Sequence, residues 1–149
     1  MKEGSRAFVT DCEGPISKND NAFELMSHIV PNGDRLFSLI SCYDDILVDI
    51  IKKPSYNAGG TLRLILPFLK AYGATNKLLK DYSSKNVLLV PGADETLKFV
   101  NSLMSSFIVS TSYEQYIFSL CEILGFPKKN VYCTKLDIDK YHLPECEIT

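Results

Sequence analysis

The sequence predicts an α/β fold in which short strands alternate with helices. Two apolar runs, residues 7–10 and 107–110, have the length and the β-branched content of buried strands, and polar residues follow each run directly. Apolar residues at helical spacing occupy most of the chain between them. In open α/β sheets, ligands bind beyond the carboxyl ends of the strands. We therefore expect a site where these two strands end.

Length and composition limit the class of protein. The 149 residues suit one domain of ordinary size with a single core. Hydrophobic residues make up 46% and charged residues 23% of the chain, which argues against disorder. A net charge of −2 gives no field for holding nucleic acid or an acidic membrane. We expect partners that recognise a site, and no nucleic acid among them.

The cysteines and the N-terminus indicate a cytoplasmic protein. The five cysteines are an odd number without a Cys-x-x-Cys pair, so neither a disulfide framework nor a zinc site is indicated. The N-terminal residues run directly into the first strand and leave no room for a signal peptide. Apolar stretches are too short and too often interrupted by charge to span a bilayer. Peripheral association with a membrane complex is compatible with all of this.

Two carboxylates follow the first strand. Asp11 and Glu13 precede a Gly14-Pro15 break, and the period of two along an extended chain puts both on the same side of the backbone. The side chain of Cys12 points the other way, which favours packing over chemistry. The simpler alternative is a strand that ends in polar turn residues. Ser110 and Thr111 stand at the end of the second strand.

Residues 16–86 are predicted to be mostly helical. Apolar periodicity indicates helices near 20–29, 34–50, 61–72 and 75–84, with Thr75 as a cap of the last and a kink or early end at Pro67. Asp44 and Asp45 are expected on a solvated helix face. A crossover between parallel strands needs only about a dozen residues, so this segment is an insertion. The alternative is that its helices simply pack on the sheet.

The second half of the chain repeats the strand and helix pattern. Residues 85–91 are predicted to be extended, 92–104 helical, 113–124 helical and 130–133 a third strand. Gly125 is the expected C-cap of the helix over 113–124, with Pro127 beyond it.

These stretches resemble the haloacid-dehalogenase-like (HAD) phosphohydrolase superfamily. Motif I of that superfamily is an apolar strand followed by Asp-x-Asp and a Gly, and motif II is an apolar strand that ends in Ser or Thr. Asp11 matches the nucleophile, Glu13 stands where the second Asp usually is, and Ser110 matches the motif II hydroxyl. The Glu is a departure that adds a methylene. More narrowly, Thr-Asp-Cys-Glu-Gly-Pro and Ser-Thr-Ser-Tyr-Glu-Gln-Tyr resemble a group of archaeal HAD-like proteins, some labelled as a subunit of a membrane-bound energy-converting hydrogenase.

The resemblance implies a fold and a reaction. The fold is a Rossmann-like parallel sheet with its core in residues 1–15 and 87–149, and with a helical cap, residues 16–86, inserted between the two motifs. The reaction is Mg²⁺-dependent hydrolysis of a small phosphomonoester through an aspartyl-phosphate. By resemblance, Asp11 is the nucleophile and a metal ligand, and Glu13 is the general acid and base and a ligand through its carbonyl. Ser110 and Thr111 hold the phosphoryl oxygens.

Two parts of the superfamily's site are not recognisable. A Lys and an acidic metal-binding pair should follow motif II, but Lys128, Lys129 and Lys135 come too soon, and Asp137 and Asp139 flank a single Ile. Solvated surface is the simpler role of all five. A non-catalytic binding or assembly subunit on this fold is therefore an alternative to the phosphatase. An unrelated α/β binding domain with a chance Asp-x-Glu is a third.

The missing part also predicts a bare strand edge. In the superfamily the motif I strand is central, with two later strands on one side of it. Without them, residues 7–10 have an unpaired edge, which is a template for pairing unless something covers it. We expect a homodimer, the chain's own C-terminal segment or a partner chain at this edge.

Overall fold

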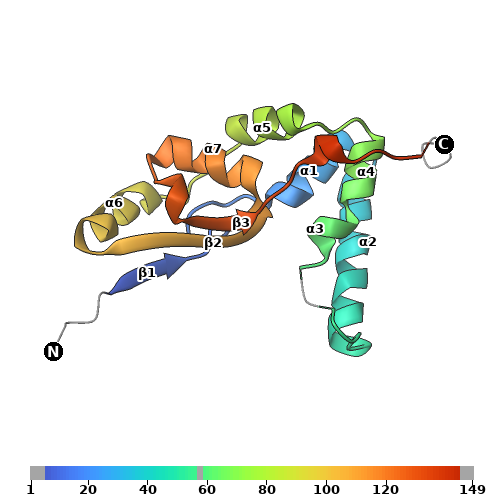
Figure 1. Cartoon of the computed structure of the whole chain (residues 1–149), viewed down its shortest axis with the longest axis horizontal. Helices are drawn as coiled ribbons and strands as arrows, with labels where there is room; N and C mark the ends of the chain where they lie inside the picture. The colour runs from blue at the N-terminus through green and yellow to red at the C-terminus, as the bar shows by residue number, and fades with distance from the viewer. Residues whose placement is uncertain (1–5, 57–58, 145–149) are drawn as a thin grey trace. The chain divides into compact units, whose positions relative to one another are not determined.

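The computed structural model describes residues 6–56 and 59–144 (Figure 1). The chain forms two compact units. The first contains Met1–Asp20 and Lys80–Leu136, and the second contains Asn21–Leu79 and Asp137–Thr149. The predicted division into a core of 1–15 and 87–149 and an insertion of 16–86 stays a prediction.

The first unit contains a three-stranded parallel sheet in the order β1-β2-β3, which confirms the predicted α/β class. The strands are β1 (Ala7–Thr10), β2 (Ser105–Tyr113) and β3 (Val131–Thr134). Thr10 of β1 pairs with Ile108 of β2, which pairs in turn with Val131 of β3. β2 is longer than the predicted 107–110 because it continues beside β3 as far as the pair Tyr113 and Thr134. The predicted extended segment 85–91 forms only an isolated bridge between Leu89 and Ser17.

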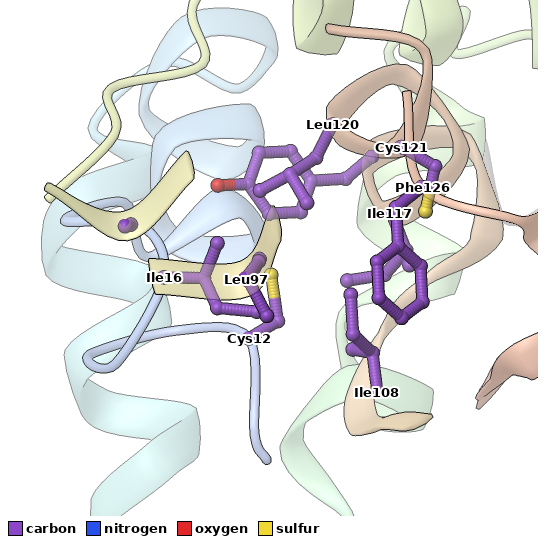
Figure 2. Close-up of a cluster of buried hydrophobic side chains, with 10 residues drawn as sticks. Cys12, Ile16, Leu97, Ile108, Ile117, Leu120, Cys121 and Phe126 are labelled. Atoms are coloured by element: carbon purple, nitrogen blue, oxygen red, sulfur yellow. The ribbon is translucent and has the colours of Figure 1, made fainter. Parts of the chain in front are cut away.

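Two helices cover one face of this sheet. They are α6 (Ala93–Leu103) and α7 (Glu114–Leu124), and Figure 1 shows both on the same side of the strands. Gly125 ends α7 with a φ of 64°, the left-handed C-cap that the sequence predicts. Beneath the helices lies the core of the unit (Figure 2), whose buried members are Cys12, Ile16, Ala93, Leu97, Ile108, Tyr116, Ile117, Leu120, Cys121 and Phe126.

The other face of the sheet is apolar and open. Strand residues alternate between the two faces, so Val9 and Val109 point away from buried Ile108. Both side chains are exposed, as is that of Tyr132 on β3. Within the described residues, β1 pairs with β2 alone and forms an edge of the sheet. The expected bare edge at β1 is therefore present in the sheet.

A buried polar cluster fixes the loop that follows β1. The Tyr116 hydroxyl lies 2.7 Å from Ser17 Oγ and 3.0 Å from Asn19 Oδ1. Asn19 Oδ1 also accepts the N–H of Leu88, and Asn19 Nδ2 donates to the carbonyl of Asn86, both at 2.8 Å. The cluster thus joins the loop after β1 to α7 and to the segment that leads to α6.

The second unit is helical, as predicted. Its elements are α1 (Asn21–Ile29), α2 (Gly33–Asp45) with a π-helical turn at Ile46–Ile50, α3 (Thr61–Leu64), α4 (Leu66–Ala71), the start of α5 (Asn76–Lys85) and a 3₁₀ turn at Ile138–Lys140. The predicted break near Pro67 is confirmed, because α3 ends before Ile65 and the proline lies in the first turn of α4. Thr75 caps α5 as predicted, since its Oγ1 accepts the N–H of Leu78 at 3.1 Å. Within the described parts of the chain, no helix is long and apolar enough to cross a membrane.

The expectation that Asp44 faces solvent is wrong. Its side chain is buried, with 4% of the residue exposed, while Asp45 beside it is exposed. Asp44 Oδ1 accepts the Tyr56 hydroxyl at 2.7 Å, and Oδ2 accepts both the N–H and the hydroxyl of Thr61 at 2.9 Å. These donors come from the loop before α3 and its first residue, so the carboxylate ties that loop to α2.

The same contacts set the charge state of this pair. Burial alone would raise the pKa of Asp44, but the hydrogen bonds from Tyr56 and Thr61 outweigh it and lower the pKa below its usual value. The hydrogen bond to Asp44 in turn raises the pKa of Tyr56 to about 12. The carboxylate and the neutral phenol are thus the forms that the fold selects.

We predict that Asp44→Asn lowers the free energy of unfolding at pH 7 by about 1–3 kcal/mol, because buried donors lose a charged acceptor. A lowered pKa gives stability that is present above the unfolded-state value, about 3.9, and lost as the pH falls through the folded-state value. The difference between wild type and variant should therefore shrink in acid. Urea unfolding followed by circular dichroism measures it.

Asp45→Asn is the matched control, because this neighbouring carboxylate is exposed. Equal losses of stability in the two variants would contradict the buried role of Asp44.

Candidate active site

Asp11 is the first residue after β1. Its Oδ1 accepts the backbone N–H of Cys12 at 2.6 Å, and its own carbonyl accepts the Thr10 hydroxyl at 2.9 Å. The side chain is exposed. One carboxylate oxygen is therefore engaged by the backbone, and the group stands in water at the end of the strand.

A tight loop carries Glu13. The N–H groups of Ile16 and Ser17 both donate to the Cys12 carbonyl at 3.0 Å, and the Gly14 N–H donates to the Ser17 carbonyl at 2.7 Å. Gly14 has a φ of 98°, in the region that side chains rarely adopt, so the turn requires glycine there. Glu13 is half-buried. The loop thus returns on itself within a few residues and keeps Glu13 close to the end of β1.

Cys12 packs inward, as predicted. Its side chain is fully buried and its Sγ lies 3.8 Å from Ser17 Oγ. Burial raises the pKa of the Cys12 thiol to about 12, and the charges of Glu13 and Asp11 add to this, against a lowering by the Ser17 hydrogen bond. The thiol therefore stays protonated at neutral pH and is no nucleophile. It anchors the residue between the two carboxylates in the core.

Ser110 and Thr111 lie on the neighbouring parallel strand, as expected, but inside β2 and not at its end, because β2 continues to Tyr113. Thr10 pairs with Ile108, so Asp11 and Ser110 follow the same pair by one and two residues. Ser110 Oγ accepts the N–H of Ser112 at 3.3 Å. Thr111 is exposed, and its carbonyl accepts the hydroxyl of Thr134 at 2.5 Å. All of these polar groups lie beyond or near the carboxyl end of β1.

The register of the sheet changes at this point. Regular alternation puts Asp11 on the face of Val9 and Ser110 on the opposite face, with Ile108. However, the pairing of β2 with β3 is irregular between Val109 and Tyr113. Such irregularities re-aim side chains and are common beside active sites. The irregular stretch contains all three hydroxyl residues of the Ser-Thr-Ser sequence.

Ser112 was missed by the sequence analysis. It is buried, and within the described residues its Oγ has no hydrogen-bond partner. A buried hydroxyl without a partner is costly unless it serves a ligand or water. The signal in the sequence was the third hydroxyl residue after the apolar run, directly before the predicted helix over 113–124.

The downstream charged residues have other partners. Lys128 Nζ lies 2.7 Å from Glu122 Oε1 and 5.2 Å from the ring centroid of Phe118. Asp137 accepts the side-chain amide of Asn76 at 2.7 Å, and Asp139 accepts its backbone N–H at 3.1 Å. Both aspartates are exposed, as expected, and together they hold the first turn of α5.

Asp11 and Glu13 are the residues that could hold a cation. Mg²⁺ takes one or two protein carboxylates and fills its octahedron with waters and substrate phosphate. The exposed Asp11 carboxylate and the backbone carbonyl of Glu13, two residues further along the same short loop, suit that pattern. In the described residues, however, no group of three or more His, Cys, Asp or Glu gathers at metal-binding distance. The donors fit a metal that depends on substrate and water for most of its ligands.

A separate cavity of about 270 Å³ lies within the second unit. Its walls are mostly apolar. The polar lining residues include Arg63 of α3, Lys70 of α4 and His142. It contains none of the predicted site residues.

Comparison with known proteins yields structural matches. The chain is similar to gene product AF1437 from Archaeoglobus fulgidus, with 32% identity and a TM-score of 0.89 over 97% of this chain and 45% of that chain. The chain thus spans less than half the length of this relative. A weaker likeness, in fold alone, is to DsGPDH of Dunaliella salina, with 17% identity, a TM-score of 0.52, and coverage of 88% of this chain and 21% of that one. No protein-family model and no curated protein matches the chain.

We predict that alkylation of the native protein discriminates the cysteines. At pH 8, a pKa near 12 leaves Cys12 with roughly a thousandfold less thiolate than an ordinary cysteine of pKa about 8.5. Exposed Cys42 should be modified by iodoacetamide while Cys12 stays intact. Peptide mass spectrometry reads the result. Equal labelling would show that the loop after β1 does not hold Cys12 in the core.

Proposed function

We propose that this chain is a HAD-like Mg²⁺-dependent phosphohydrolase, or the part of one that carries the nucleophile. The observation that supports this most is that Asp11 directly follows β1 while Ser110 lies in the adjacent parallel strand β2, two residues beyond the pair Thr10 and Ile108. That edge is where α/β folds bind ligands. The substrate class is a small phosphomonoester.

The surroundings of the strands agree with this proposal. Residues 16–86 lie between the two motifs, and most of them form the helical second unit. In the proposed fold they are a cap that excludes water from the reacting phosphate. Loop residues of the cap would then select the substrate.

The proposed reaction is a double displacement. Asp11 Oδ1 is held by the Cys12 N–H, so Oδ2 is free to form a bond to phosphorus as the P–O bond to the leaving group breaks. The leaving alkoxide takes a proton from Glu13, and the resulting carboxylate then takes a proton from the water that hydrolyses the aspartyl-phosphate. Bound Mg²⁺ would supply neutralisation of the phosphate charge.

In the proposed reaction, hydroxyls near the end of β2 would hold the phosphoryl oxygens. Ser110 and Thr111 are the sequence-predicted donors, and the buried Ser112 hydroxyl, without a partner in the described residues, is a third. Donors that are fixed before the reaction stabilise the charge that develops on the transferred group.

A non-catalytic binding or assembly subunit on the same fold is the second candidate. Lys128 is paired with Glu122, and Asp137 and Asp139 hold Asn76. These contacts favour the alternative, because they engage Lys128, Asp137 and Asp139 with partners other than Asp11. Association with a membrane complex would belong to this candidate.

We expect Asp11 to bind beryllium trifluoride in the presence of Mg²⁺, because this anion mimics a phosphoryl group on a carboxylate. Fluorine NMR should show a bound signal in the wild-type chain and none in Asp11→Asn, which keeps the size of the side chain. Asp34→Asn, at an exposed position of α2, is the control and should retain the signal. Absence of any bound signal in the wild type would favour the non-catalytic subunit.

Turnover by the 149-residue chain should be slow or undetectable. The Lys and the acidic pair of the superfamily are not recognisable, so charge on the phosphate lacks its usual neutralisation. The assay is hydrolysis of p-nitrophenyl phosphate with Mg²⁺. Brisk turnover that Asp11→Asn abolishes would show that the chain already contains groups that serve in their place.

A further inference from the structure

We propose that the cavity in the helical second unit binds a small carboxylate with an apolar body, at a site separate from the candidate active site. The cavity has a volume of about 270 Å³, and all of its lining residues belong to the second unit. Its walls are mostly apolar, and they carry two cations, Arg63 and Lys70. A ligand that matches both features has an apolar body and a negative charge.

One wall of the cavity is a single face of α3 and α4. Leu66, Pro67 and Lys70 lie three, four and seven residues after Arg63, which is the spacing of side chains that share one side of a helix. The helical path continues across the boundary between α3 and α4, because the N–H and the carbonyl of Ile65 both make helical hydrogen bonds of 3.0 Å. This wall therefore presents two apolar side chains between two cations.

The opposite wall is the 3₁₀ turn at Ile138–Lys140 and the residues that follow it. The side chain of Ile138 is fully buried, and its N–H donates to Asn76 Oδ1 at 3.0 Å. The side-chain amide of Asn76 donates to Asp137 at 2.7 Å, and its backbone N–H donates to Asp139 at 3.1 Å. These three hydrogen bonds fix the turn before a ligand arrives, and a preformed wall lowers the cost of ordering on binding.

The charge of the lining is positive, although the chain as a whole carries a net charge of −2. Arg63 and His142 are exposed and Lys70 is half-buried, so these polar groups reach the solvent side of the cavity. Within residues 6–56 and 59–144, neither Arg63 nor Lys70 forms an ion pair with a carboxylate. Both cations are therefore available to an anion that enters the cavity.

The two cations and the apolar walls together favour a carboxylate as the anionic group. The planar guanidinium of Arg63 can donate two parallel hydrogen bonds to a carboxylate. A single negative charge is also less costly than two to bring against apolar walls. An apolar cavity of about 150 Å³ holds benzene, so the larger volume here has room for a body beyond one ring. Octanoate has both the head group and an apolar body, and it is the probe that we choose.

Titration calorimetry on the whole 149-residue chain, without Mg²⁺, tests the proposal. We expect saturable binding of one octanoate per chain, with acetate and 1-octanol each at least tenfold weaker because each lacks one of the two features. The double variant Arg63→Gln with Lys70→Gln should bind octanoate at least tenfold more weakly. Arg35→Gln with Lys77→Gln removes the same charge from exposed positions of the second unit outside the cavity lining, and should bind as the wild type does. Asp11→Asn should also leave octanoate binding unchanged.

Methyl NMR locates the ligand without any substitution. Octanoate should shift the methyl signals of Leu66 and Ile138, which line the cavity, and leave those of Ile108, which is buried in the first unit. Circular dichroism should show that both double variants are folded.

Four outcomes would overturn the proposal. They are the absence of saturable octanoate binding, equal binding of 1-octanol, equal loss of affinity in the two double variants, and methyl shifts at Ile108 in place of Ile138. Loss of binding in Asp11→Asn would also overturn it, because the anion would then occupy the candidate active site. None of these measurements involves phosphoryl transfer, so failure here is distinct from failure of the proposed phosphohydrolase activity.

Discussion

The position of the candidate site depends on one buried hydroxyl, that of Tyr116. The Tyr116 hydroxyl donates toward Ser17 Oγ at 2.7 Å and toward Asn19 Oδ1 at 3.0 Å, so one buried O–H group holds two residues of the loop after β1. Asn19 uses its remaining capacity on the backbone of Asn86 and Leu88. Because each group is buried, loss of one partner leaves the others unsatisfied at a cost of about 1–3 kcal/mol each. The loop with Asp11 and Glu13 is therefore fixed from its far end, by α7.

Local signals in the sequence were sufficient to predict most helices and strands. Contacts between residues far apart in the chain could not be predicted from them. Pro67, Thr75 and Gly125 each determine a helix boundary through their own backbone or side chain, and the structure agrees at all three. Asp44 was placed wrongly because helical periodicity gives a face but not what covers it. The donors that bury it come from a loop and a helix start further along the chain.

The sequence predicted those site residues whose positions depend on where the strands end. Carboxyl ends of parallel strands meet at one edge of a sheet, so Asp11 and Ser110 were expected near the same edge if the two runs formed parallel strands of one sheet, as they do. Ser112 could not be found in this way. The end of β2 is decided by its pairing with β3 at Tyr113, and the irregular register before that pair has no signature in the residues themselves.

The pairing of β1 with β2 decides how far Asp11 lies from Ser110. Asp11 is held by a four-residue edge strand, and its distance from Ser110 depends on a few backbone pairs with β2. Edge strands with one neighbour open more readily than central ones, because fewer buried contacts and hydrogen bonds must break. Val9 precedes Asp11 by two residues, and Val109 precedes Ser110 by one. A change in the pairing of β1 with β2 would therefore move Asp11 relative to Ser110.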